Sequence, residues 1–210
     1  MRDEIVDYIR RNRVSTTEVA DCLDKTGVLE GVTALNRGHF CVGPVFWCYG
    51  WENSNWTVHE QIQHAPEGCI IVITAIDCGN RALIGDLVSK YLLLYRQVRA
   101  IVVDGNVRDA PRLIKENWPI WCIGTNPVGC FNTAPVSEPT EVQLATGQRF
   151  RNAIAVCDDC GVVIVESRFH TPSFLAKLKQ VEGQEDMWYE CIDRRKWSTF
   201  DTVCLKKYQS

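Results

Sequence analysis

The 210-residue chain has no apolar run long enough to cross a membrane and no excess of positive charge. A membrane span needs about 18 consecutive apolar residues. The formal net charge is −3 and the basic residues form no stripe, so we expect neither a membrane nor a nucleic acid as partner. The chain also has no internal repeat. Its charged start, Met1 to Glu4, differs from a secretory signal, which favours a cytoplasmic protein.

Cysteine, by contrast, is abundant, with eleven residues. The count is odd, and Cys69 and Cys122 lie in apolar β-like runs, so we expect reduced and mostly buried thiols. Cys157 and Cys160 have a CxxC spacing. No second such pair and no close histidine pair accompanies them, so a zinc site is not expected.

The middle of the chain alternates between β-like runs and helical segments. The expected strands are 69–76, 99–103 and 119–123, and the helices between them are 86–96 and 109–117. Strands that alternate with helices predict a parallel sheet with right-handed crossovers. The sequence therefore predicts an α/β fold with a central, partly parallel sheet in a single domain.

The flanking segments are less regular. Before the alternating region we expect helices at 2–11 and from the capping box Ser15–Glu18, a strand at 40–46 interrupted by Gly43-Pro44, and a helix at 57–64. After it we expect a loop at 125–139, short β segments at 141–144, 153–156 and 162–165, and a helix at 173–181. These divide the domain into N-terminal helices (about 2–25), a core (about 38–168) and a C-terminal helix and tail (about 172–210).

Two charged clusters begin consecutive helices in the alternating region. Gly85-Asp86 opens one helix, and Arg108-Asp109 opens the next. Each cluster follows a β-like run, so both should lie at the same edge of the sheet, where open α/β folds bind ligands. Taken singly, each aspartate is better explained as a helix N-cap. Their coincidence with Arg108 favours a binding site.

The residue types at this edge suit a 2-oxo acid bound with a metal. Arg108 and the first N–H groups of a helix, those of Leu87 and Val88, can hold a carboxylate. Mg²⁺ takes oxygen ligands and needs only one or two carboxylates. The cation and Arg108 would stabilise an enolate oxygen. The alternative, a lysine Schiff base, lacks a lysine in either cluster.

At these residues the chain resembles the RraA-like family, which includes the regulator of ribonuclease E activity A and the class II 4-hydroxy-4-methyl-2-oxoglutarate aldolases. The motif is Gly85-Asp86-Leu87, a spacer, and Val103 to Asp109. Weaker matches flank it, at 17–28, 43–46, 55–62 and 157–165, so that the likeness covers about residues 15–168.

The resemblance implies a swivelling β/β/α sandwich, assembly as a homotrimer or a dimer of trimers, and dependence on Mg²⁺ or Mn²⁺. It implies cleavage of 4-hydroxy-4-methyl-2-oxoglutarate to pyruvate and decarboxylation of oxaloacetate. Asp109 would bind the metal, Asp86 would hold metal-bound water, and Arg108 would contact the pyruvate oxygen. The backbone at Gly85, Leu87 and Val88 would bind the carboxylate. A neighbouring subunit would contribute one acid, with Glu185, Asp186 and Glu190 as candidates.

The chain departs from the family pattern at three places. The spacer between Asp86 and Arg108 has one extra residue, which we place within 91–98. Arg112 stands where many members have an acidic residue. Trp47 replaces a small residue, which predicts a reshaped pocket. His59, three residues after Trp56, is better explained as a packed or surface residue than as part of the pocket.

Two functions are open from sequence. The first is a metal-dependent lyase that acts on 2-oxo acids. The second is a non-catalytic, protein-binding regulator of a ribonuclease. The intact Arg108-Asp109 pair together with Asp86 favours the enzyme, because a binding module has no need for that combination.

Overall fold

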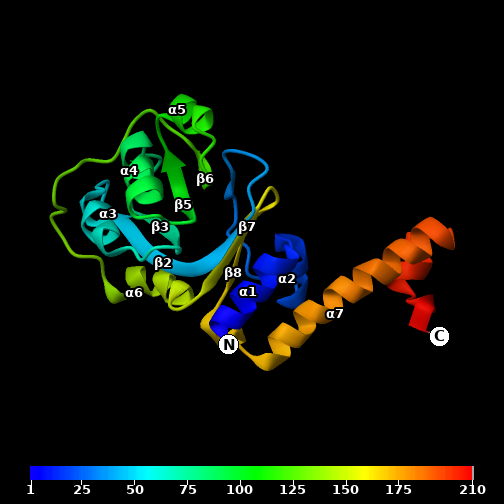
Figure 1. The fold of residues 1–210 in the computed structure, drawn as a ribbon. Coiled ribbons are helices and arrows are strands. Elements are labelled where there is room, and N and C mark those ends of the chain that lie inside the picture. The colour runs from blue at the N-terminus through cyan, green and yellow to red at the C-terminus, as the bar shows by residue number, and fades with distance from the viewer. Residues whose placement is uncertain (210) are drawn as a thin grey trace.

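The computed structural model describes residues 1–209 of the chain, and over this range its centre is one mixed β-sheet of eight strands (Figure 1). The strand order is β1-β6-β5-β3-β2-β7-β8, with β4 paired beside β5. The strands are β1 (Thr33–Ala34), β2 (Cys41–Trp51), β3 (Ile70–Ile76), β4 (Ala82–Ile84), β5 (Ala100–Val107), β6 (Ile120–Thr125), β7 (Ile154–Asp158) and β8 (Gly161–Val165). The fold class is the expected mixed α/β arrangement.

The parallel half of the sheet confirms the expectation from the alternating region. Strands β2, β3, β5 and β6 are parallel neighbours, and β4 also runs parallel to β5. Strands β3 and β5 begin as continuous β-branched runs whose side chains are buried on both faces, as is usual for sheets covered on both sides. The sequence-based prediction missed β4, which is only three residues long.

Strand β2 connects the two halves of the sheet. Its first part, Cys41–Pro44, pairs antiparallel with β7, and its second part, Val45–Trp51, pairs parallel with β3. The expected interruption at Gly43-Pro44 is therefore wrong, because the strand continues through it. Pro44 lies where the strand changes partner, a position that tolerates the missing N–H donor.

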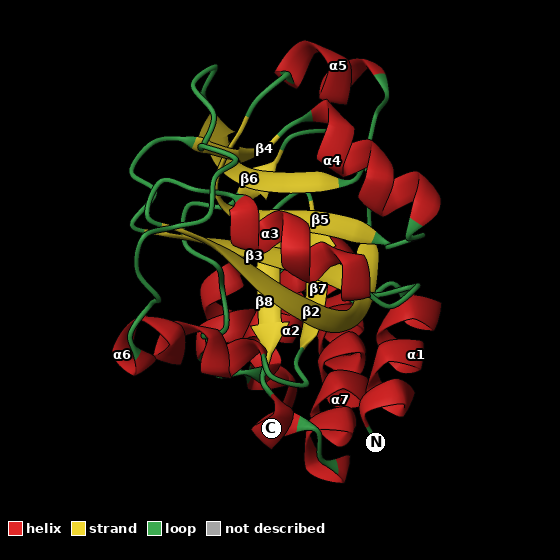
Figure 2. Ribbon diagram, turned by 90° about the vertical axis from the view of Figure 1, so that its left-hand side faces the viewer, coloured by secondary structure: helices red, strands yellow, loops and turns green. Residues whose placement is uncertain are grey.

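The helices cover a face of the sheet as well as its ends (Figure 2). They are α1 (Arg2–Asn12), α2 (Thr16–Cys22), α3 (Trp56–Gln61), α4 (Asp86–Lys90), α5 (Ala110–Lys115), α6 (Glu141–Ala145) and α7 (Pro172–Tyr189). Helices α1, α2 and α7 share a core with β7 and β8. The predicted capping box of α2 is present, with Ser15 accepting from Glu18 N–H. No helix among residues 1–209 is both long and apolar enough to cross a membrane.

In the C-terminal half one expectation is wrong, and another is confirmed with a longer span. Residues 141–144 form helix α6 rather than a strand, because Thr140 and Gln143 make a capping box that starts a helix. The helix expected at 173–181 extends to Tyr189 as α7, which carries the C-terminus away from the sheet (Figure 1). Single π turns follow at Glu190–Arg194 and Phe200–Cys204.

Candidate active site

The structure brings the two charged clusters together at one edge of the sheet. Ile84 at the end of β4 pairs with Val107 at the end of β5, and Arg108 N–H donates to Ile84 O at 2.9 Å. The residues that follow each strand, Gly85-Asp86 and Arg108-Asp109, therefore lie side by side. Parallel pairing of two strand ends is what positions these side chains.

Gly85 allows the two clusters to approach closely. Asp86 N–H donates to Asp109 Oδ2 at 3.3 Å. A Cβ atom at position 85 would lie 2.2 Å from the same oxygen and 2.9 Å from Arg108 Cγ. The φ angle of Gly85 is −142°, which any residue adopts, so the requirement for glycine is one of space.

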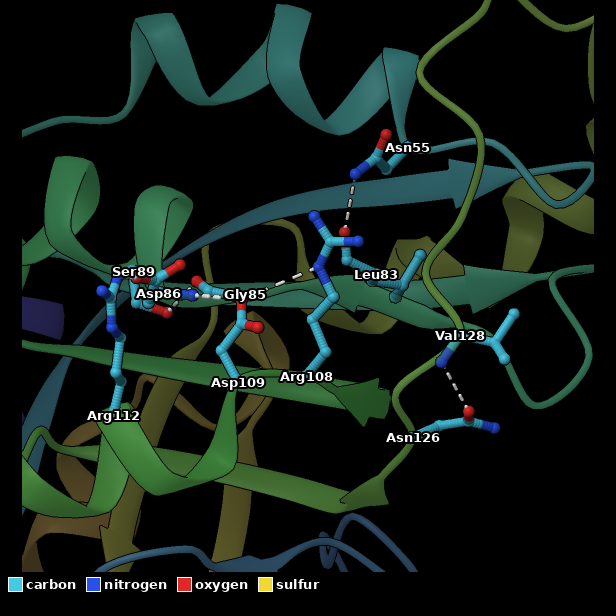
Figure 3. Close-up of polar contacts among 10 residues, drawn as sticks. All are labelled: Asn55, Leu83, Gly85, Asp86, Ser89, Arg108, Asp109, Arg112, Asn126 and Val128. Atoms are coloured by element: carbon cyan, nitrogen blue, oxygen red, sulfur yellow. Dashed lines mark hydrogen bonds and ion pairs between the residues drawn. The ribbon is translucent and has the colours of Figure 1, made fainter.

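Four charged groups form a row across the two clusters (Figure 3). Arg112 Nη1 lies 2.5 Å from Asp86 Oδ2, and Asp109 Oδ2 accepts a hydrogen bond from Asp86 N–H. Arg108 Nε lies 3.7 Å from Asp109 Oδ2. The hydrogen bond from Arg112 is the largest cause of a lowered pKa at Asp86, with a further contribution from Leu87 N–H. Asp86 is therefore ionised at neutral pH.

The Asp109 side chain does not cap the helix that it precedes. Asp109 occupies the N-cap position of α5, but its side chain makes no capping hydrogen bond. Its backbone is left-handed, with φ 60°, which is uncommon for a residue other than glycine. This conformation costs of order 1 kcal/mol, and such strain concentrates at functional sites. The carboxylate faces Gly85 and Arg108 instead of the helix.

The predicted site residues line one small cavity of about 80 Å³. All six predicted residues belong to it: Gly85, Asp86, Leu87, Val88, Arg108 and Asp109. Further lining residues that the sequence did not single out for the site include Asn55, Gly129, Cys130 and Asn132. Two larger grooves, of about 520 and 540 Å³, lie along α6 and contain none of the six.

Asn55 and His59 come from the α3 region, which sequence reasoning did not assign to the site. Asn55 Nδ2 donates to Leu83 O at 2.9 Å, while its buried Oδ1 has no hydrogen-bond partner. His59 is exposed, as expected for a surface histidine, and it also lines the cavity. Burial lowers the pKa of His59, which keeps its imidazole neutral at pH 7. No short motif marks either residue.

Other residues considered from sequence lie away from the cavity. Trp47 donates through Nε1 to Thr74 Oγ1 at 3.0 Å and lines the groove beside α6, so the expected reshaping of the pocket by Trp47 is wrong. Glu185, Asp186 and Glu190 lie at the far end of α7 and the turn after it, remote from this cavity within the same chain (Figure 1). Cys157 is buried and Cys160 exposed.

The donor set at the cavity fits a hard divalent cation. Asp86 and Asp109 provide two adjacent carboxyl groups that line the cavity. Within residues 1–209, no three His, Cys, Asp or Glu side chains gather into a ready-made metal cage. Mg²⁺ does not require one, because it keeps several waters and is satisfied by one or two carboxylates plus substrate oxygens.

The structure is thus a mixed α/β fold with two carboxylates and two guanidinium groups at one edge of the sheet, beside a small cavity. Residues 16–164 match the family model described as RraA-like, Aldolase/RraA, and the chain belongs to this family.

Two relatives are both named "Putative 4-hydroxy-4-methyl-2-oxoglutarate aldolase". The one from Halalkalibacterium halodurans is 33% identical over 186 residues, which is 86% of each chain. The one from Bacillus cereus is 28% identical over 119 residues, covering 57% of this chain and 74% of the relative.

Solved structures share the fold. An uncharacterized protein from Pseudomonas syringae pv. tomato aligns with a TM-score of 0.71 at 22% identity, over 95% of this chain and 96% of the other. RraAS2 of Streptomyces coelicolor, described as an unusual member of the RNase ES inhibitor RraA protein family, aligns with a TM-score of 0.65 at 24% identity, over 87% and 92% of the two chains. At these identities the likeness shows the fold alone.

Proposed function

We propose that this protein is a divalent-cation-dependent lyase that breaks a carbon–carbon bond in a 2-oxo acid and releases pyruvate. The observation that carries the proposal is the row of Arg108, Asp109 and Asp86 along one small cavity. The names of the relatives support 4-hydroxy-4-methyl-2-oxoglutarate as a substrate. Oxaloacetate is a second candidate, because its decarboxylation produces the same pyruvate enolate.

Arg108 would bind the 2-oxo oxygen and neutralise the enolate. Its guanidinium has room beside Gly129, since a Cβ there would lie 2.6 Å from Arg108 Nη1. Gly85 and the first turn of α4 form the adjacent wall, where Val88 N–H would donate a hydrogen bond to the substrate carboxylate. Leu87 N–H is shared with the Asp86 carboxylate. A water in the cavity would return a proton to the enolate carbon.

Asp109 would hold Mg²⁺ or Mn²⁺, and Asp86 would hold water in the shell around the cation. A cation in this place supplies electron withdrawal from the 2-oxo group. The chain would fix the Asp86 and Asp109 carboxylates side by side and would hold the Arg108 guanidinium against the 2-oxo oxygen of the substrate. Fixed charges aimed at a developing negative charge are the largest single contribution to many enzymatic rates.

We also propose a homotrimer or a dimer of trimers, in which Glu185, Asp186 or Glu190 of one copy completes the cavity of the next. Within one chain the cavity is open enough to leave the Arg108 side chain 49% exposed. Tyr189, Phe200 and Leu205 add exposed apolar surface at the end that carries these acids. Eleven free cysteines support a reducing, cytosolic location.

The test is pyruvate release from 4-hydroxy-4-methyl-2-oxoglutarate and from oxaloacetate by the wild-type protein, with Mg²⁺ and with EDTA. Release that Mg²⁺ sustains and EDTA abolishes supports the proposal. Metal-independent release, or none from a folded protein, contradicts it for these substrates. The second outcome would favour the ribonuclease regulator, to which the fold of the Streptomyces protein gives support.

A further inference from the structure

Arg112 is the charged residue at the site that the proposed function does not use. It projects from α5 to the Asp86 carboxylate on α4, with Nη1 2.5 Å from Oδ2 (Figure 3). The Arg112 side chain is 77% exposed and that of Asp86 is 27% exposed. Such an exposed pair contributes little to stability. Arg112 adds little to folding stability but contacts a carboxylate of the cavity, so its main effect should be on ligand binding.

Arg112 brings the formal charge of the site to zero. Two carboxylates, Asp86 and Asp109, face two guanidinium groups, Arg108 and Arg112. The carboxylates attract a divalent cation that enters alone and the guanidinium groups repel it, so the net attraction is smaller than two free carboxylates would give. A dicarboxylate 2-oxo acid carries two negative charges, and its pair with the cation is neutral. The charges of the site therefore favour binding of the cation together with the dianionic acid over binding of the cation alone.

We propose that Arg112 couples the two ligands, so that the divalent cation binds weakly until a dianionic 2-oxo acid is present. This inference rests on the proposed function. Coupling is reciprocal, so the cation strengthens binding of the acid by the same factor. A monocarboxylate would leave one positive charge uncompensated, so Arg112 also selects dicarboxylates.

The experiment is a titration of the full chain with Mn²⁺, followed by the electron paramagnetic resonance signal of the free ion, with and without oxalate. Oxalate is a dianion that does not react. Wild type is compared with Arg112→Gln, with the charge-conserving Arg112→Lys, and with Lys115→Gln. Lys115 is exposed on the same helix, so its replacement removes one positive charge away from Asp86. Ionic strength is held constant, because salt screens exposed charges.

We expect oxalate to lower the wild-type Kd for Mn²⁺ about tenfold or more, within the usual range of coupling. In the absence of oxalate, Arg112→Gln should bind Mn²⁺ about tenfold more tightly than wild type. Oxalate should then lower its Kd for Mn²⁺ by a correspondingly smaller factor. Arg112→Lys and Lys115→Gln should behave as wild type does.

Equal Mn²⁺ affinity with and without oxalate in wild type, or an unchanged oxalate effect in Arg112→Gln, overturns the coupling while leaving a metal site and the proposed lyase in place. A folded protein that binds no Mn²⁺ under any of these conditions overturns both.

Discussion

Gly85 is the residue whose size matters most to the geometry of the cavity. We expect Gly85→Ala to displace the Asp109 side chain, because the added Cβ would lie 2.2 Å from Asp109 Oδ2. The side chain can turn away, so folding stability should change by no more than about 1 kcal/mol. A misplacement of about 1 Å at a reacting group lowers the rate about a hundredfold, and we expect a loss of this order for Gly85→Ala. Steady-state pyruvate release and urea unfolding measure the two effects.

Gly183→Ala is the matched control, because a Cβ at this position on α7 meets nothing within 4 Å. It should leave the rate unchanged and raise stability by about 0.5–1 kcal/mol, as expected for glycine in a helix. A Gly85→Ala protein as active as the control would show that the position of Asp109 is unimportant.

Asp109 allows charge to be separated from backbone conformation. Asparagine tolerates the left-handed region, so Asp109→Asn should keep the unfolding free energy of wild type while lowering the rate about a hundredfold. Asp109→Ala should lose the same activity and an additional 1 kcal/mol or so of stability, because alanine is strained at φ 60°. Substantial activity in Asp109→Asn would exclude a role for the carboxylate charge.

Only those site residues that come directly after a β-like run could be predicted from the sequence. Gly85, Asp86, Arg108 and Asp109 could be placed because each pair ends an apolar run in a βα alternation. Asn55 could not, since its position depends on how α3 packs over β4, a tertiary contact without a local signal.

Between these residues, the segment from α4 to β5 contains an irregular helical turn. The helix that starts at Asp86 changes to a π turn at Tyr91–Tyr95, in which Arg96 N–H donates to Tyr91 O five residues earlier. A π turn takes up one residue more than an α turn. The π turn lies within the segment 91–98, where we place the extra residue, and that placement stays a prediction.

At helix α6 the sequence did contain a local signal, but residues 141–144 were predicted as a strand and form a helix. Val142 and Leu144 alternate with polar residues as in a strand, yet the capping box of Thr140 and Gln143 starts a helix. A five-residue segment offers too short a period to distinguish the two, and the cap decides.

Helix α7 is fastened to α1 by one hydrogen bond that can be tested by pH. Tyr8 Oη donates to Glu182 Oε2 at 2.6 Å. Burial and this bond raise the pKa of Tyr8 to about 12. Because the folded-state pKa is raised, the contribution of Tyr8 is complete below pH 10 and is lost as pH rises from 10 to 12. At pH 8, Tyr8→Phe should lose about 1 kcal/mol of unfolding free energy.

Urea unfolding of wild type and Tyr8→Phe at pH 8 and pH 11 measures this difference, which should shrink at the higher pH. Tyr189→Phe is the control, since Tyr189 is 66% exposed; it should match wild type at both pH values. A difference between wild type and Tyr8→Phe that stays constant with pH would contradict the assignment.

Across the whole chain, the parallel half of the sheet supplies the cavity, and the antiparallel half with α1, α2 and α7 forms a second core. This division explains why the charged groups of the site gather at one edge while the C-terminal acids lie far from it. It also separates two kinds of effect: changes at α7 should alter stability or assembly, and changes at the sheet edge should alter chemistry.

The most direct test of the account is the rate of pyruvate release by Arg108→Ala at saturating Mg²⁺, beside Arg37→Ala. Arg37 is exposed and lies outside the cavity lining, so it controls for loss of an arginine as such. Removing one group that stabilises a developing oxyanion should lower the rate about a hundredfold or more, with unfolding unchanged and Arg37→Ala fully active. Wild-type release by a folded Arg108→Ala protein would contradict the claim that this cavity is the active site.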